Sequence, residues 1–514
     1  MDQSTIDFIN EKQILVSPEL FDKDFDGNVI RKLILDENPD FLDEGIVKNY
    51  LSKISIDVSN KKELGVDNKK KSKVTIIKSY DKEPRKRTFQ DFVSVFNNRF
   101  KKLSEMLKSR QELSSVTSIS RLHTKNHNDK TAIIGMVSDK QFTKNNNILL
   151  TLEDTTGTCT VIVKKDDEKK ELFVVAENLV LDEVIGVTGT LLNKAVFAEK
   201  IIFPDIPISK ELKKQKEEEY VVMLGDTHFG SNHFMTEDFE RFIKWINQDM
   251  GSDVQKNIAS KVKYIILTGD VVEGVGIYPG QENDLEIKDI VDQYDEAARW
   301  LGKIPSNIDI VIQSGNHDAG RLSEPQEAPF RDMAKALWDM PNVTLVSNPG
   351  YVNLGRTDSF PGFDFLLYHG GSLIFYADNI PKIRALGGQK RSDLIMKALL
   401  QKRHLAPTHK STLYLPDPDD DFLLIDIIPD FFITGHIHRS SVSSYRNITI
   451  INASCWTETT EDQIKRGLEP LPARIPVVNL KTRDVKLINF LSKKSKEKEI
   501  EASKSVEELK KLEK

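Results

Sequence analysis

The second half of the chain contains five apolar runs rich in β-branched residues, each of which leads into a polar turn containing glycine. The runs are VVML, YIIL, IDIVIQ, FDFLLY and FFIT. Helical stretches such as residues 237–250 separate several of them, and this βα alternation predicts an α/β domain over residues 220–490. The turns that follow are Gly225-Asp226-Thr227-His228, Gly269-Asp270, Gly315-Asn316-His317-Asp318, His369-Gly370-Gly371 and Gly435-His436-Ile437-His438.

These turns bring the carboxylates of Asp226 and Asp270, the amide of Asn316 and five of the ten histidines of the chain to the ends of successive strands. Open α/β sheets bind their ligands at the carboxyl ends of the strands. A single Gly-Asp turn after a strand is usually only a turn, but five such turns argue against coincidence. The donors, which include no thiolate, suit manganese, iron or zinc better than calcium. They are too many for one ion, and two ions sharing a carboxylate are suited to phosphoester hydrolysis.

A different pattern precedes this domain. Residues 116–207 contain about five short strands and no βα alternation, which predicts an all-β Greek-key barrel of the OB type. Such barrels often bind single strands of nucleic acid. This one has few aromatic residues, so a barrel that contacts DNA and a barrel that contacts protein both remain open.

The remaining segments are short and charged. Residues 61–110 contain 16 Lys and Arg against 6 Asp and Glu, a first indication of a polyanionic partner. A helix over 88–115 is predicted from the capping-box pattern at Thr88–Asp91 and from the apolar stripe that follows it. The predicted segments are a small helical region (1–50), a basic mobile linker (51–87), this amphipathic helix (88–115), a charged hinge (208–219) and a disordered charged tail (491–514).

The composition limits the cellular setting. No apolar run approaches the roughly 18 residues of a membrane-spanning helix, so no membrane contact is expected. Cys159 and Cys455 are the only cysteines, which argues against a disulfide framework and fits a reducing cytoplasm. The net charge of −6 argues weakly against a surface that binds nucleic acid all over.

The ordered motifs Asp-x-His, Gly-Asp, Gly-Asn-His-Asp, His and Gly-His-x-His resemble the calcineurin-like metallophosphoesterase superfamily. That resemblance implies a two-sheet sandwich flanked by helices and two divalent ions. It assigns one ion to Asp226, His228, Asp270 and His438, and the other to Asp270, Asn316, His369 and His436. It makes His317 a catalytic residue without a metal bond, and it places at Glu273 the carboxylate that orients this histidine. Manganese is the expected metal, with iron, zinc or nickel as alternatives.

A narrower resemblance lies in the stretches GDVVEGVGIYPGQEND (269–284), GNHDAGRLSEPQ (315–326), RHLAP (403–407), PDFFITGHIH (429–438) and NASCWTETTEDQ (452–463). These stretches are similar to the small, exonuclease subunits of archaeal family D DNA polymerases. The resemblance implies a 3′→5′ proofreading exonuclease that acts on DNA and binds a large catalytic subunit. Contact with a sliding clamp remains open.

Two alternatives remain at this point. The chain is a scaffold with a structural or weakly active metal site, or it is a phosphatase or repair nuclease that acts alone. The intact His317 argues against the first alternative, and the barrel that precedes the metal domain argues against the second. Three side chains near the motifs are candidate contacts to a DNA phosphate, with packing roles as the alternative, namely Arg321, Arg403 and His404.

Overall fold

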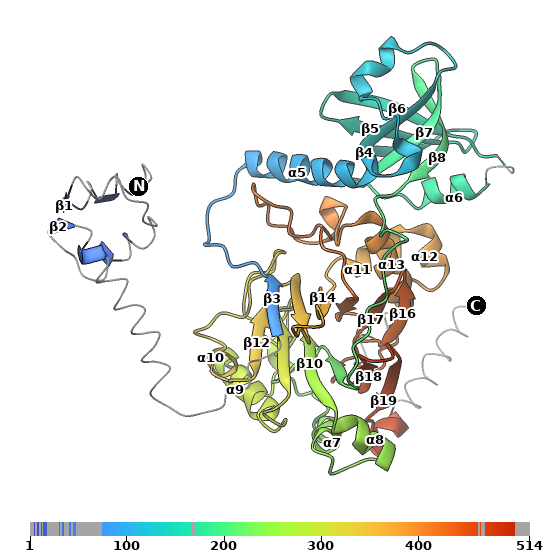
Figure 1. Ribbon diagram of the computed structural model, residues 1–514. Coiled ribbons are helices and arrows are strands. Elements are labelled where there is room, and N and C mark those ends of the chain that lie inside the picture. Colours follow the sequence, from blue (N-terminus) through green and yellow to red (C-terminus); the bar gives the residue numbers. More distant parts are fainter. Residues whose placement is uncertain are drawn as a thin grey trace. The chain divides into compact units, whose positions relative to one another are not determined.

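The computed structural model describes residues 74–166, 170–460, 463 and 468–498, together with scattered positions between 5 and 47. The chain divides into two compact units, Met1–Lys71 and Ser72–Lys514. The second unit contains the metallophosphoesterase-type sandwich and the barrel (Figure 1).

Two six-stranded sheets form the α/β domain. The first has the order β12-β11-β10-β9-β18-β19, and the second has the order β16-β17-β15-β14-β13-β3. The strands of the first sheet are β9 (Tyr220–Leu224), β10 (Val262–Thr268), β11 (Asp309–Gln313), β12 (Val343–Val346), β18 (Arg474–Asn479) and β19 (Val485–Asn489). Those of the second are β3 (Val74–Lys78), β13 (Gly350–Leu354), β14 (Phe363–Leu367), β15 (Phe431–Thr434), β16 (Ser441–Tyr445) and β17 (Ile448–Asn452).

Alternating side chains on each strand explain why the sheets form a sandwich. Val221 and Met223 of β9 lie in the core between the two sheets, whereas Val222 and Leu224 face the helices. Successive side chains of a strand point to opposite faces, so a strand that is apolar throughout must be covered on both sides. The expected sandwich flanked by helices is therefore observed.

Helices cover the outer face of each sheet. The first sheet packs against α7 (Thr236–Ile246), α8 (Asp253–Ala259), α9 (Ile290–Leu301) and α10 (Lys335–Trp338). The second packs against α11 (Leu373–Asn379), α12 (Pro381–Ala385) and α13 (Ser392–Lys402). No helix in the described part of the chain is both long and apolar enough to cross a membrane.

Five strands close into the barrel, in the order β4-β5-β6-β8-β7. They are β4 (Lys130–Phe142), β5 (Ile148–Asp154), β6 (Gly157–Val163), β7 (Val184–Leu192) and β8 (Ala195–Ile202). The region is not all-β, because α6 (Lys170–Glu177) joins β6 to β7 and packs on the barrel core through Ala176. The closed barrel agrees with the sequence, and its OB-type assignment remains a prediction.

The predicted amphipathic helix is α5 (Phe89–Lys108). Asp91 accepts a hydrogen bond from the backbone N–H of Thr88 at 2.6 Å, as in a capping box, and a second one from the Thr88 hydroxyl at 3.0 Å. Leu103 and Leu107 are buried in one cluster with barrel residues such as Ile134. The apolar side chains along α5 therefore form a packing surface against the barrel.

The basic linker predicted over 51–87 does not extend to its expected end, because Val74–Lys78 forms β3 and pairs antiparallel with β13. Several of the described lysines and arginines between residues 78 and 102 contact acidic side chains of the same chain. Contacts to residues 417–426 join Lys78 to Asp420 (2.9 Å), Lys82 to Asp417 (2.9 Å), Arg99 to Asp421 (2.7 Å) and Lys102 to Asp420 (2.6 Å). Part of the local positive charge is thus neutralised within the protein, which weakens its value as a sign of a polyanionic partner.

The other charged segments also differ from expectation where they are described. In the predicted hinge, Lys213 contacts Asp364 at 3.1 Å and Asp430 at 2.7 Å, which holds the segment against the second sheet. The tail begins with ordered residues, since Leu491 is buried and residues 493–498 are helical. Residues 499–514 lie outside the described residues, as do all of residues 51–73.

The small helical region predicted over 1–50 is not confirmed. Among its described residues, β1 (Leu15–Val16) and β2 (Phe41–Leu42) form a short parallel pair. A small apolar cluster that includes Ile9, Ile30 and Leu33 lies within the same unit.

Candidate metal centre

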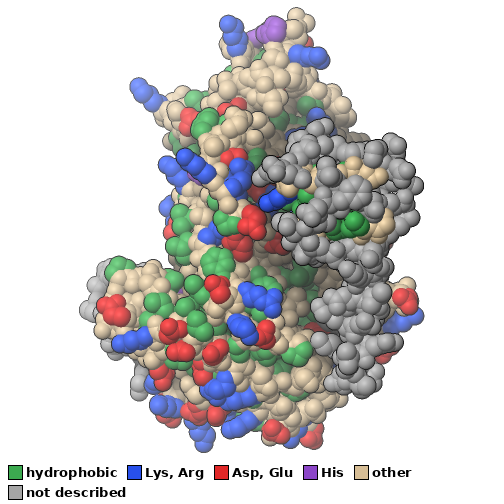
Figure 2. All heavy atoms as spheres, turned by 90° about the vertical axis from the view of Figure 1, so that its left-hand side faces the viewer, with side chains coloured by type: hydrophobic (Ala, Val, Ile, Leu, Met, Phe, Trp, Pro, Cys, Tyr) green, Lys and Arg blue, Asp and Glu red, His purple; other side chains and the backbone are tan. Residues whose placement is uncertain are grey.

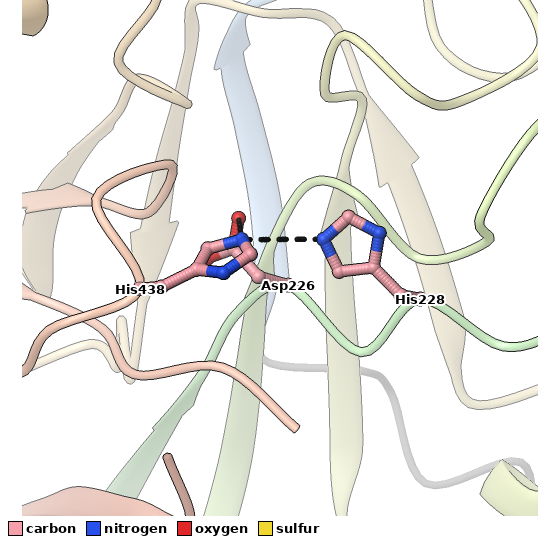
Figure 3. Close-up of side chains that lie close together, drawn as sticks. All are labelled: Asp226, His228 and His438. Carbon is pink, nitrogen blue, oxygen red and sulfur yellow. Dashed lines mark hydrogen bonds and ion pairs between the residues drawn. The ribbon is translucent and has the colours of Figure 1, made fainter. Parts of the chain in front are cut away.

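Three donor side chains from the ends of β9 and β15 meet in a first group (Figure 3). The group consists of Asp226, His228 and His438, whose donor atoms all lie within 4.8 Å of one another. The Nε2 atoms of His228 and His438 are 3.3 Å apart, and Nε2 of His438 lies 3.6 Å from Oδ1 of Asp226. His228 and His438 are about 200 residues apart in the sequence, but they meet in space because β9 and β15 end at the same rim of the sandwich.

A second group of donors lies beside the first and consists of Asp270, His369 and His436. Nε2 of His369 is 3.2 Å from Oδ2 of Asp270, 3.2 Å from Nδ1 of His436 and 3.0 Å from Oδ1 of Asn316. Oδ2 of Asp270 is also 3.8 Å from Nε2 of His228 in the first group. The structure therefore brings together all seven predicted ligands, with Asp270 between the two groups.

Five of these residues have a left-handed backbone. The φ angles are 48° at Asp226, 49° at His228, 48° at Asp270, 68° at His436 and 53° at His438. Such angles are uncommon outside glycine and cost about 1–3 kcal/mol each. Strain of this kind concentrates at functional sites, because the sharp turns aim side chains where regular structure would not.

Glycines beside the carboxylates make room for the turns. A Cβ atom at Gly315 would lie 2.2 Å from Oδ1 of Asp270, and one at Gly435 would lie 2.7 Å from Oδ2 of Asp226. Backbone N–H groups then fix both carboxylates, since His436 donates to Asp226 at 3.0 Å and His317 donates to Asp270 at 2.9 Å. Gly315 and Gly435 therefore allow the carboxylates to lie close to the backbone, in addition to allowing the turns.

The histidine contacts fit metal ligation. Nδ1 of His369 lies 2.8 Å from the carbonyl oxygen of Thr268, which fixes the proton on Nδ1 and leaves Nε2 facing the other donors. A ring N–H held by a carbonyl is the usual support of a metal-binding histidine. Paired imidazole nitrogens that face each other, together with carboxylate and amide oxygens, form a donor set suited to divalent transition metals. The residues present therefore fit two divalent ions, which the resemblance implies.

Glu273 has a different role from the one expected. Its carboxylate faces His228, with Oε2 3.0 Å from Nδ1, whereas it is 3.8 Å from Nδ1 of His317. His317 is instead held by the backbone carbonyl of Glu273, at 2.7 Å. Tyr278 and Gln281, from the stretch shared with the polymerase subunits, donate to Oε1 of Glu273 at 3.2 and 3.3 Å. No role was predicted for this pair, although both residues lie in the stretch 269–284 that carries the narrower resemblance.

Burial and mutual charge shift the pKa values of the site. Burial, with the charge of His369, lowers the pKa of His436 to about 3. Burial also opposes protonation of His369 and His228, yet the carboxylate of Asp270 raises the pKa of His369 to about 10, and that of Glu273 raises the pKa of His228 to about 9. Cations would compete with these protons, so metal affinity should increase with pH.

The three predicted phosphate contacts are engaged within the protein. Arg403 is 4% exposed, and its Nε donates to the carbonyl of Ile425 at 2.7 Å, while His404 is fully buried against Asp421. Arg321 forms an ion pair with Glu327 and lies 5.4 Å from the ring centroid of Tyr80. This geometry gives no support to the expectation that they bind DNA.

No role was predicted from the sequence for Asp318 either. Its carboxylate accepts hydrogen bonds from the backbone of Gly315 at 2.8 Å and of Val271 at 3.1 Å, and from the hydroxyl of Tyr294 at 3.2 Å. It thereby ties the turn of Asn316 and His317 to the turn that carries Asp270. Its position as the last residue of the Gly-Asn-His-Asp motif is the sequence feature that could have indicated this role.

Residues 220–440 match the calcineurin-like phosphoesterase family. The chain is 40% identical over 390 residues to the DNA polymerase II small subunit of Methanothermobacter thermautotrophicus, covering 76% of this chain and 77% of that protein. The corresponding protein of Archaeoglobus fulgidus is 38% identical over 388 residues, with 76% and 75% covered. That of Thermoplasma acidophilum is 32% identical over 493 residues, with 95% and 93% covered.

Proposed function

Because this chain belongs to the family of DNA polymerase II small subunits and carries a calcineurin-like phosphoesterase domain, we propose that it is a metal-dependent 3′→5′ exonuclease. In this proposal it removes mismatched nucleotides from the 3′ end of a primer and binds the large catalytic subunit of the polymerase. The observation that carries the proposal is the convergence of the seven predicted donors beside His317, which forms a third close group with His228 and Glu273 and is not one of the seven.

The ligands of the proposed site are Asp226, His228, Asp270, Asn316, His369, His436 and His438. Two divalent ions, manganese in our proposal, would activate water and neutralise the charge that develops on the phosphodiester. The protein contributes the fixed positions of these donors, which the backbone N–H groups and carbonyls described above establish before substrate arrives.

His317 is proposed to serve the leaving group. Its Nδ1 is held by the carbonyl of Glu273, so its Nε2 is the nitrogen available to the substrate. In the protonated form this nitrogen would donate a proton to the departing 3′ oxygen, a role worth about 10²–10⁴-fold in rate. The ring is 4.7 Å from that of His228, measured between centroids, which places it against the first donor group.

The test is degradation of a 3′-mismatched primer by the purified full chain with Mn²⁺, alone and together with the large subunit. His317→Ala should reduce the rate by about 10²–10⁴-fold while the metal content stays unchanged. His233→Ala is the matched control, since this half-buried histidine lies 3.5 Å from Asp284 and is in none of the groups of close donor side chains found among the described residues. Degradation that persists undiminished in His317→Ala would rule out the proposal.

A further inference from the structure

A groove opens directly beside the donor groups. It has a volume of about 470 Å³, within the range of small-ligand sites, and His436 and His438 form part of its lining. One wall comes from α11 and the segment that follows it, and another comes from residues 468–470. Any group that lies in this groove is therefore adjacent to the proposed site of hydrolysis.

Three cationic side chains line this groove, together with two acidic ones, Asp378 and Glu469. Arg384 belongs to α12, Lys390 belongs to the short turn η4 (Gly388–Arg391), and Arg439 directly follows the Gly-His-x-His motif. Arg384 is exposed, and within the described part of the chain no acidic side chain forms an ion pair with it. No motif pointed to these three residues, because their nearness follows from the packing of three separate segments.

Glu469 lies between two of these cations. Its Oε1 is 2.6 Å from Nζ of Lys390, and its Oε2 is 3.8 Å from Nη1 of Arg439. The same arginine nitrogen donates to the backbone carbonyl of Glu469 at 2.8 Å. The carboxylate therefore screens two cations at a place where the oxygens of a phosphate would find the same donors.

The rest of the surface is less suited than this groove to binding a polyanion. The chain has a net charge of −6, and acidic and basic side chains are interspersed over the lower part of the face shown in Figure 2. The affinity for a nucleic-acid backbone comes from local cations that neutralise phosphates. The groove combines such cations with direct access to His436 and His438.

We propose that this groove binds the phosphodiester backbone of a single strand of nucleic acid whose end is cut at the adjacent metal centre. Arg384 contacts a phosphate directly, and Glu469 limits the affinity by screening Lys390 and Arg439. This inference rests on the proposed function, and it adds the binding site and its determinants to the hydrolytic site.

The experiment measures binding and hydrolysis separately in the full chain with Mn²⁺. Binding is followed by the fluorescence anisotropy of a labelled oligothymidylate whose phosphorothioate linkages resist hydrolysis, over a series of salt concentrations. Arg384→Ala should weaken binding severalfold and reduce the slope of log K against log salt by about 0.7, the value for one phosphate contact on a single strand. Glu469→Gln should strengthen binding, because it removes a negative charge and keeps the backbone bond to Arg439.

Hydrolysis of bis(p-nitrophenyl) phosphate serves as the second measurement, since so small a diester reaches the metal centre without the groove. Arg384→Ala should keep wild-type kcat/KM for this diester and raise KM for an unmodified oligothymidylate of the same length, which the enzyme can hydrolyse. Arg356→Ala, an exposed arginine that donates to the carbonyl of Pro361, should match wild type in both assays.

The outcomes separate the two proposals. An unchanged affinity and salt slope in Arg384→Ala, or weaker binding in Glu469→Gln, would overturn the groove assignment. Loss of the small-diester activity in Arg384→Ala would also overturn it, because the residue would then act on the metal centre itself. If wild type hydrolyses neither substrate, the proposed function fails, and the salt slopes still decide whether the groove binds the strand.

Discussion

Two buried clusters of aspartate and histidine lie in the same domain and differ in how their nitrogens are used. In the metal centre, imidazole nitrogens face one another, as at the 3.3 Å contact of His228 with His438. In a second cluster, formed by Arg99, His404 and Asp421 and here called the Arg99 cluster, each of these polar groups has a protein partner. Asp421 is 2.7 Å from Arg99 Nε and 2.9 Å from His404 Nε2, and His404 Nδ1 accepts from Ala406 at 3.0 Å.

This difference distinguishes a metal-binding histidine from a structural one. His404 has both nitrogens engaged within the protein, and its backbone carries no left-handed strain. His228, His436 and His438 have positive φ angles and direct a nitrogen at other donors. Burial alone does not separate the two cases, because His228 and His369 of the metal centre, at 3% and 1% exposed, are nearly as buried as His404, at 0%.

The largest expected effect is on the metal centre. Asp270→Asn should abolish both metal binding and hydrolysis, because the amide replaces the anionic carboxylate that lies between the two donor groups. Metal content by elemental analysis and primer degradation provide the measurements. Asp358→Asn, at an exposed aspartate, should leave both unchanged. Retention of the full metal content by Asp270→Asn would contradict the assignment.

The next effect concerns stability and the Arg99 cluster. Arg99→Met should destabilise the fold by about 3–5 kcal/mol, because it leaves the buried carboxylate of Asp421 without its cation. Urea unfolding provides the measurement, and kcat at a temperature where the variant is folded should match wild type. A variant as stable as wild type would show that the cluster contributes nothing to the fold.

A smaller effect is expected at Glu273, which contacts the metal centre through His228. Glu273→Gln should weaken metal affinity by about 10–100-fold, because the neutral amide no longer supports Nδ1 of His228 as an anionic acceptor. A Mn²⁺ titration of activity provides the measurement. Half-saturation at the wild-type concentration would show that the carboxylate does not act through His228.

The smallest effect is a pH dependence. Burial, followed by the charge of Arg99, lowers the pKa of His404 below its ordinary value of 6.5. Below that pH the unfolded chain therefore binds a proton that the folded chain does not. The stabilisation is complete above pH 6.5 and should decrease by up to about 1.4 kcal/mol per pH unit as the pH falls.

His404→Asn should remove this component, so the difference in unfolding free energy between wild type and variant should shrink as the pH falls from 7.5 to 5.5. Urea unfolding of both proteins at several pH values provides the measurement. A difference that stays constant over this range would show that His404 titrates equally in both states.

Several features were predictable because their signals are local. The capping box of α5, the apolar runs of the sheets and the polar turns at the strand ends each depend on residues close in sequence. β3 was not predictable, since VTIIK lies among lysines and its partner β13 is about 270 residues away. The burial of Arg403 and His404 was equally hidden, because the acceptors that hold them come from residues 421–426.

The sequence by itself determined the kinds of donor at the strand ends and the order in which they occur, because side-chain alternation and glycine turns follow from neighbouring residues. Tertiary structure alone decided which nitrogen faces which oxygen, including the contact of the Glu273 carboxylate with His228 rather than His317. The reason is that such contacts depend on differences of about an ångström between side chains that packing brings together from distant segments.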